Sequence, residues 1–302
     1  MTKAKIDKKS EKPPASVAAA APAPKPSKTP LYSAFNASRY MRQQLIKQIE
    51  EETGAKLLCY MATAEIDRDD VMFFVDLIHN VPKGSSIDLL LHTPGGDVDA
   101  AEKLIELVRN RKGDGKFRVI VPDRAKSAGT LIALGADTIV MSDTSELGTI
   151  DPQYIGKDAH GNEVHLSVFD YLSSYETYAE QLRKDPNDPA ARAMFEKFDP
   201  AVLNKFKQVK SRARIFGENQ LKRHGTTYTA IVAQLMDTKT YPSHGQMIGA
   251  DHAKQMGLQV DVMQMDEPLW QSLWQLYCHF RLALTQPGIS KMFESAYASN
   301  SE

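Results

Sequence analysis

The sequence predicts an α/β fold, because short apolar runs typical of strands alternate with segments that carry a helical apolar stripe. In the first half of the 302-residue chain, strands are expected at 56–62, 87–92, 117–121 and 138–141. Hydrophobic residues make up 42% and charged residues 25%, which is typical of a globular protein with a sizeable core. After Pro152 the pattern becomes mostly helical, so helical additions to this core are expected.

The first elements follow from local spacing. A helix is expected over 38–51, and the nearly unbroken apolar run 56–62 (KLLCYMA) is typical of a buried strand. In the next helix, 69–80, apolar residues recur at i, i+3, i+4 and i+7, and the helix after strand 87–92 repeats this spacing from Ala101 to Val108. A short helix at 127–134 separates the last two strands of this half.

The second half is expected to hold helices and one final strand, at 258–262. The spacing of apolar residues predicts helices at 164–182, 200–216, 227–236, 250–256 and 267–284. The last of these carries Trp270 and Trp274 on a broad apolar face, which fits either core packing or a subunit contact.

The chain is expected to consist of three segments, of which the first stands out by its composition. Residues 1–30 hold seven lysines, only two acidic residues and six of the sixteen prolines, which predicts a disordered basic Pro/Ala-rich tail. The main domain is expected over 31–265 and a C-terminal helical extension over 266–302. The whole chain has a net charge of −1, two cysteines and no apolar run long enough to span a membrane. These features favour a cytoplasmic protein without stable membrane insertion.

Three strand ends carry groups suited to acyl chemistry. Gly95 and Gly96 lie between a strand and a helix, where bare backbone N–H groups favour an oxyanion or a phosphate. Ser127 stands in a small-x-Ser-x-Gly turn between strand and helix, and the N–H of Ala128 could donate to a developing oxyanion. Asp151 follows the next strand. Taken singly, these are also a tight turn, a helix cap and a turn aspartate.

Taken together and in this order, the three motifs resemble the Clp-protease/crotonase superfamily. The resemblance covers about residues 38–262 and is strongest to the serine dehydrogenase proteinase family, a Clp-like group with a Ser-Asp-His triad. The segment 241–244 (Tyr-Pro-Ser-His) is similar to a motif of that family, and 249–261 is similar to the closing segment of signal-peptide peptidase A. The family implies a spiral of ββα units. Clp proteases carry their histidine where this chain has Asp151, so a plain Clp-type triad is ruled out.

The resemblance implies that Ser127 is the nucleophile, Asp151 the orienting carboxylate and His244 the general base. It also implies that Gly95, Gly96 and Ala128 bind the substrate carbonyl. His92 is a rival base beside the glycine loop. A Ser–Lys dyad is a further alternative, for which Lys205 and Lys210 flank the apolar stripe of helix 200–216. The expected role of these lysines without catalysis is packing at the edge of a buried face.

The sequence is therefore interpreted as a serine endopeptidase that cleaves peptide bonds through an acyl-enzyme, with a protein or peptide substrate. No cofactor and no metal site are predicted, and no nucleic-acid partner is expected despite the basic segment 196–223. Clp-like folds usually assemble into rings or stacked trimers, so a homo-oligomer is expected by resemblance. The alternatives are a crotonase-like acyl-CoA enzyme and an inactive scaffold.

Overall fold

The computed structural model describes residues 28–157 and 161–302. The chain divides into two units, residues 1–37 and residues 38–302. The described part of the first unit contains the short helix α1 (Pro30–Phe35), which is capped by Thr29 and buries none of its residues. The predicted disordered tail falls mostly on residues 1–27, outside the described residues, and stays a prediction.

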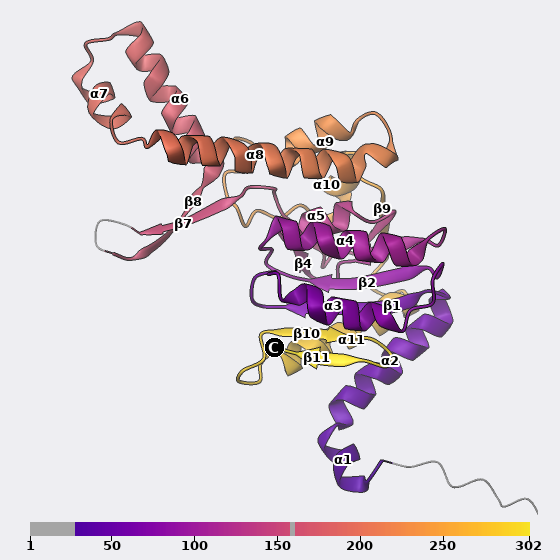
Figure 1. The fold of residues 1–302 in the computed structure, drawn as a ribbon. Helices are drawn as coiled ribbons and strands as arrows, with labels where there is room; N and C mark the ends of the chain where they lie inside the picture. Colours follow the sequence, from indigo (N-terminus) through magenta and orange to yellow (C-terminus); the bar gives the residue numbers. More distant parts are fainter. Residues whose placement is uncertain (1–27, 158–160) are drawn as a thin grey trace, which may run out of the picture. The chain divides into compact units, whose positions relative to one another are not determined.

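A central parallel sheet confirms the α/β class (Figure 1). Its strand order is β11-β10-β1-β2-β3-β5-β9, in which β1, β2, β3, β5 and β9 run parallel and β10 runs antiparallel to β1. The strands have the bounds β1 Lys56–Ala62, β2 Ile87–His92, β3 Phe117–Ile120, β5 Thr138–Met141, β9 Val260–Val262, β10 Lys291–Glu294 and β11 Ser299–Ser301. The carboxyl ends of the parallel strands meet at one edge, where ligands bind in such folds.

Helices cover both faces of this sheet, because successive strand residues point to opposite sides. In β1, Leu58 and Tyr60 pack in one apolar cluster with the helices α3 (Asp70–His79), α4 (Val98–Lys112) and α5 (Ala128–Leu134). Leu57 and Cys59 pack in a second cluster with α2 (Ala37–Thr53) and α11 (Pro268–Ala283). Each fully buried aliphatic side chain contributes about 1.5–3 kcal/mol, so both layers stabilise the sheet.

The terminal aromatic helix packs in the core. Trp270 in α11 is 1% exposed and lies in the second apolar cluster with Phe280. Core packing is therefore confirmed for Trp270, while a subunit contact made by this helix stays a prediction.

The remaining elements lie outside the seven-stranded sheet. They are the strands β4 (Arg124–Ala125), β6 (Glu146–Leu147), β7 (Gln153–Lys157) and β8 (Glu163–Ser167), the helices α6 (Val168–Lys184), α7 (Pro189–Phe195), α8 (Pro200–Leu221), α9 (Tyr228–Leu235) and α10 (Ala250–Gln255), and the turn η1 (Lys222–His224). β4 pairs with β6, and β7 with β8. Among the described residues, no helix combines the length and apolar character needed to span a membrane.

Two expectations about the elements were wrong. The helix expected over 164–182 begins at Val168, because Ser167 caps it and the preceding residues form the second strand of a hairpin. The strand at 258–262 is not the last, since the segment 266–302 also contains β10 and β11. β10 (KMFE) has a charged residue at each end, so its apolar core is too short to be recognised as a strand. Both charged side chains are buried in ion pairs.

Candidate active site

The Gly95–Gly96 loop follows β2 and is shaped by close backbone contacts. Both glycines have positive φ, 106° and 142°. A Cβ on Gly96 would lie 2.4 Å from the backbone of Ile66, and one on Gly95 would lie 2.7 Å from Cβ of Ser127, so only glycine fits. Ile66 N–H donates to the Gly95 carbonyl (2.7 Å), and Asp97 N–H donates to the Ile66 carbonyl (2.8 Å). This pairing fixes the loop and, among the described residues, leaves the N–H of Gly96 without an acceptor.

Ser127 lies at a strained turn between β4 and α5. Among the described residues it is the only non-glycine with positive φ, at φ 50° and ψ −114°. Such a conformation costs about 1–3 kcal/mol and is held by its surroundings. The Ser127 side chain makes no capping hydrogen bond to α5, so the simple helix-cap explanation does not apply. The turn instead leaves its hydroxyl free at the start of the helix.

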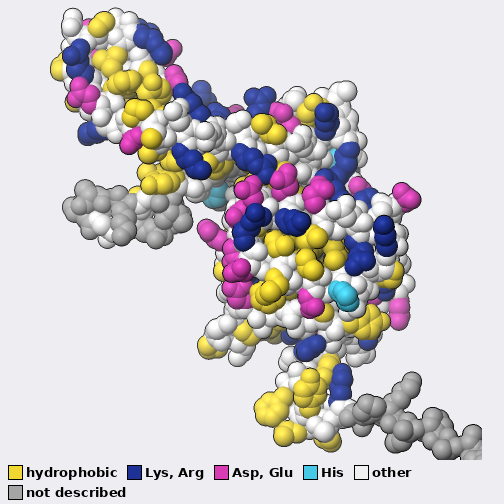
Figure 2. Space-filling view, viewed as in Figure 1, with side chains coloured by type: hydrophobic (Ala, Val, Ile, Leu, Met, Phe, Trp, Pro, Cys, Tyr) yellow, Lys and Arg dark blue, Asp and Glu magenta, His cyan; other side chains and the backbone are white. Residues whose placement is uncertain are grey.

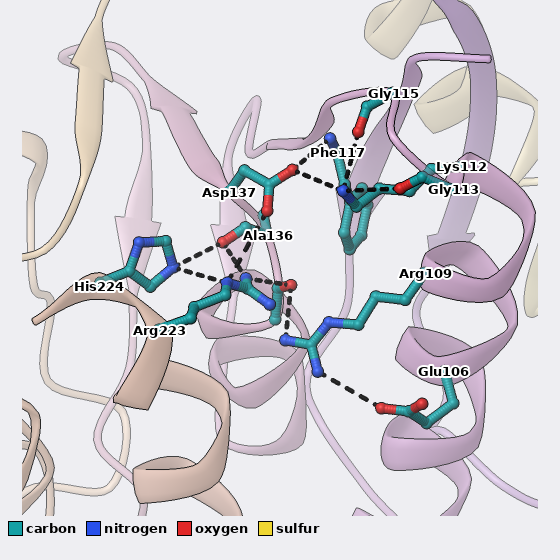
Figure 3. Close-up of polar contacts among 11 residues, drawn as sticks. Glu106, Arg109, Lys112, Gly113, Gly115, Phe117, Ala136, Asp137, Arg223 and His224 are labelled. Carbon is teal, nitrogen blue, oxygen red and sulfur yellow. Dashed lines mark hydrogen bonds and ion pairs between the residues drawn. The ribbon is translucent and has the colours of Figure 1, made fainter. Parts of the chain in front are cut away.

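The opposite end of α5 is anchored by cations (Figure 3). Arg109 in α4 donates to the Gly135 carbonyl (3.1 Å), and Arg223 in η1 donates to the carbonyls of Gly135 and Ala136. Burial, together with the nearby charge of Arg109, lowers the pKa of Arg223 to about 10. Positive charge at a helix C-terminus is stabilising. These contacts therefore help to hold the helix that carries Ser127 at its first turn.

Asp151 is buried, and both of its carboxylate oxygens accept hydrogen bonds. It is 5% exposed and accepts a hydrogen bond from the Ser167 hydroxyl (2.7 Å) and another from the Gln153 amide (2.7 Å). The Ser167 hydroxyl also accepts the N–H groups of Phe169 and Asp170 at the start of α6. The carboxylate is thus held by two side chains that the sequence analysis did not single out.

His244 lies in a loop that is anchored to the serine turn. Ile248 pairs with Leu147 of β6 through two backbone hydrogen bonds of 2.9 and 3.0 Å. Lys126, beside Ser127, reaches the carbonyls of Gly245 and Gln246 (3.3 and 3.4 Å) and forms an ion pair with Glu146. Lys126 is 8% exposed, and its ammonium points to these partners, so it acts as an anchor for the His244 loop.

A cavity of about 470 Å³ joins three of the predicted groups. Gly96, Ser127 and His244 line it, and Asp151 lies directly behind, with His244 Nδ1 3.6 Å from Asp151 Oδ2. The walls are mainly apolar, from Pro94, Val98, Leu131, Ile150, Pro152 and Ala213. The structure therefore brings the residues implied by the family resemblance to one site, drawn from four separate segments of the chain.

Two backbone N–H groups at this site are free to bind an oxyanion. Within the described parts of the chain, neither the N–H of Gly96 nor that of Ala128 has a hydrogen-bond acceptor. Gly96 and Ser127 share the cavity, and Ala128 follows Ser127 at the first turn of α5. Unpaired N–H groups at a helix start favour negative charge, as an oxyanion hole requires.

The lysines of the alternative dyad lie elsewhere. Lys210 sits over the ring of Phe169 at 5.1 Å and lines a different cavity with residues of α6. Lys205 is exposed and lines a cavity next to the serine site, with Asp97 and Arg212. Neither lysine lines the Ser127 cavity.

Two arginines of helix α8 are paired with carboxylates. Figure 2 shows Lys and Arg side chains along α8 beside Asp and Glu side chains of α4. Arg212 pairs with Asp99 and Glu102 of α4, and Arg214 pairs with Glu218 one turn further along α8. Part of the basic segment that raised the question of nucleic-acid binding is thus used within the chain.

His92, the rival base, is buried away from the cavity. Arg281 donates to its Nε2 (3.0 Å), and its Nδ1 lies 3.3 Å from the Tyr277 hydroxyl. Burial lowers the pKa of His92 to about 4, with Arg281 acting in the same direction and Asp123 opposing. His92 is therefore neutral in the folded protein at neutral pH and is held in a structural network.

This low pKa makes the protein sensitive to acid. The unfolded chain has a histidine pKa of about 6.5, so it binds more protons than the folded state between about pH 6.5 and 4, and stability falls as pH falls through that range. We expect this one group to lower the free energy of unfolding by about 2 kcal/mol between pH 7 and pH 5. Urea unfolding at both pH values checks this. Between pH 7 and pH 5, the free energy of unfolding of the His92→Gln variant should fall by about that much less than in the unmodified protein. An equal fall in both proteins would contradict the low pKa of His92.

Sequence reasoning missed Gln153, Ser167 and the anchoring role of Lys126. The pattern Ser167-x-x-Asp170 before an apolar run is a helix-start signal and could have located the end of the hairpin. Gln153 lies two residues after Asp151, but nothing local indicates that its amide would turn back to the carboxylate and to His244.

Residues 38–164 match the model of the ClpP-like SDH-type serine proteinases. Two uncharacterized proteins of Methanocaldococcus jannaschii are similar in sequence. One is 47% identical over 76 residues, 25% of this chain and 26% of the relative. The other is 32% identical over 124 residues, 37% of this chain and 42% of the relative. The chain therefore spans less than half the length of these curated relatives.

Among solved structures, a membrane-bound stomatin-specific protease is similar. Its serine-to-alanine mutant aligns with a TM-score of 0.41 and 18% identity, over 66% of this chain and 75% of that chain. A lysine-to-alanine mutant in complex with a substrate peptide aligns with a TM-score of 0.39 and 16% identity, over 75% and 99%. The family match, together with the parallel sheet, confirms the Clp-like fold class that the sequence predicted.

Proposed function

We propose that this protein, whose residues 38–164 belong to the ClpP-like SDH-type serine proteinases, hydrolyses peptide bonds with Ser127 as nucleophile, His244 as general base and Asp151 as the orienting carboxylate. The observation that carries the proposal is the strained turn at Ser127, which faces a cavity shared with Gly96 and His244. A non-glycine residue with positive φ persists only where its surroundings enforce it, and such positions cluster at active sites.

The reaction follows from these positions. His244 accepts the hydroxyl proton as Ser127 Oγ bonds to the substrate carbonyl carbon, and the N–H groups of Gly96 and Ala128 stabilise the oxyanion. The imidazolium then protonates the leaving amine as the C–N bond breaks, which leaves an acyl-enzyme on Ser127. Water, deprotonated by the same imidazole, hydrolyses that ester and restores the hydroxyl. Asp151 stabilises the imidazolium at both steps.

The cavity walls suggest the kind of residue that is bound. Val98, Leu131, Ile150 and Ala213 form an apolar lining, and Glu65 is the only acidic side chain on it among the described residues. Burial of an apolar side chain there gains about 25 cal/mol per Å² of surface removed from water. An apolar residue of the substrate therefore fits next to the scissile bond. Location in the cytoplasm and assembly into a homo-oligomer stay predictions.

Covalent labelling tests the proposal. A fluorophosphonate probe should modify the full-length protein once, and peptide mass spectrometry should place the adduct on Ser127. The Ser127→Ala variant should not be labelled, while Ser173→Ala, which changes a surface serine of α6, should be labelled like the unmodified protein. Absence of labelling at Ser127 in the folded protein would overturn the proposal and favour the crotonase-like or scaffold alternative.

A further inference from the structure

The side chain of Gln153 lies between Asp151 and His244, the two residues that should pair in a catalytic triad. Its amide nitrogen lies 2.7 Å from Asp151 Oδ2, 3.3 Å from the Asp151 carbonyl and 3.3 Å from His244 Nδ1. The distance from Asp151 Oδ2 to His244 Nδ1 is 3.6 Å, longer than a hydrogen bond. The carboxylate that should bind the imidazole is thus bound by Gln153 instead.

The chemistry of the carboxylate decides which way the amide faces. An ionised carboxylate only accepts hydrogen bonds, so the group of Gln153 at 2.7 Å from Asp151 must be the NH₂ group. The reversed amide would place two acceptor oxygens against each other. The same NH₂ group faces His244 Nδ1, and it can be a partner there only if Nδ1 accepts. A neutral imidazole with Nδ1 as acceptor carries its proton on Nε2.

This tautomer is the wrong one for catalysis. A general base must present an unprotonated Nε2 to the serine and donate its Nδ1–H to the carboxylate. When an amide replaces the aspartate of such a triad, the wrong tautomer lowers kcat by about 10⁴. In this chain the Asp151 carboxylate is present but is hydrogen-bonded to Gln153. Movement of the Gln153 side chain would therefore allow His244 to adopt the catalytic tautomer.

We propose that Gln153 is a positioning residue that holds His244 in the tautomer with its proton on Nε2 until a substrate displaces the Gln153 amide. The proposal rests on the proposed function of the site. Gln153 itself lines the 470 Å³ cavity, so a peptide that fills the cavity competes for the space of its side chain. Once the amide leaves, Asp151 keeps its bond from Ser167 and Oδ2 is free to accept His244 Nδ1–H. Substrate binding would thereby switch on the base.

Removal of the amide should therefore increase reactivity. We expect Gln153→Leu to react with a short-chain fluorophosphonate, too small to fill the cavity, about threefold to tenfold faster than the unmodified protein, the rate equivalent of one net hydrogen bond. Gln286→Leu, which changes an exposed glutamine elsewhere, is the matched control and should not change the rate. Gln153→Ala is the second variant, used if circular dichroism shows that Gln153→Leu is not folded. Slower or unchanged labelling of a folded Gln153 variant would overturn the proposal.

Nitrogen-15 NMR of the imidazoles gives a readout that does not depend on activity. In the unmodified protein the His244 proton should be on Nε2, and in Gln153→Leu it should move to Nδ1. An Nδ1 proton in the unmodified protein would overturn the role of Gln153 even if Ser127 is labelled normally. If no variant is labelled at Ser127, the proposed function fails, and the NMR spectra still decide whether Gln153 sets the tautomer.

Discussion

Replacement of His244 by alanine is expected to slow the labelling of Ser127 by a fluorophosphonate about 10⁴-fold, because the hydroxyl then has no group to take its proton. Lys205→Ala and Lys210→Ala should leave the rate within about threefold of the unmodified protein, since a change outside the reacting groups leaves the transition state bound as before. Neither lysine lines the Ser127 cavity, and the Lys210 ammonium sits over Phe169.

The measurement is the second-order rate constant of labelling, compared with His79→Ala as a control for loss of an exposed histidine. Thermal unfolding of each variant checks that the fold is retained. If Lys210→Ala or Lys205→Ala abolishes labelling while His244→Ala does not, the base is a lysine and the Ser–Lys alternative replaces the triad.

Replacement of Lys291 by methionine is expected to lower the free energy of unfolding by about 3–5 kcal/mol, the usual effect of breaking a buried ion pair. Lys291 is 2% exposed, and its ammonium donates to Asp70 Oδ1 (2.9 Å) and pairs with Asp67. Asp70 is completely buried and also accepts from the Tyr60 hydroxyl (2.5 Å). Without the lysine, its carboxylate would be left inside the protein without a counter-charge.

Urea unfolding at pH 7 measures this loss, with the exposed Lys254→Met as the matched control. The double variant Asp70→Asn/Lys291→Met should be more stable than Lys291→Met alone, because it removes the charge that was left unpaired. If the single variant loses less than about 1 kcal/mol, the range for an exposed pair, the ion pair between β10 and α3 does not stabilise the fold as expected.

Sequence reasoning succeeded where the pattern lies within one element and failed where a feature depends on residues far apart in the chain. The strand 56–62 and helix 69–80 were predicted nearly to the residue, because their apolar period lies within one element. β10 was missed because its charged ends, Lys291 and Glu294, are buried only through partners far away in the chain. Arg42, the partner of Glu294, is 252 residues away, so no local pattern could reveal the pair.

The sequence by itself determined the α/β class, the glycine loop and the serine turn, because each depends on residues that are neighbours along the chain. Only the tertiary structure decided that His244 rather than Lys210 faces the Ser127 cavity, and that Gln153 stands between Asp151 and His244. The contact between Gln153 and His244 alone joins residues 91 positions apart. Their geometry is set by the packing of loops on the carboxyl edge of the sheet, which no period or spacing in the sequence encodes.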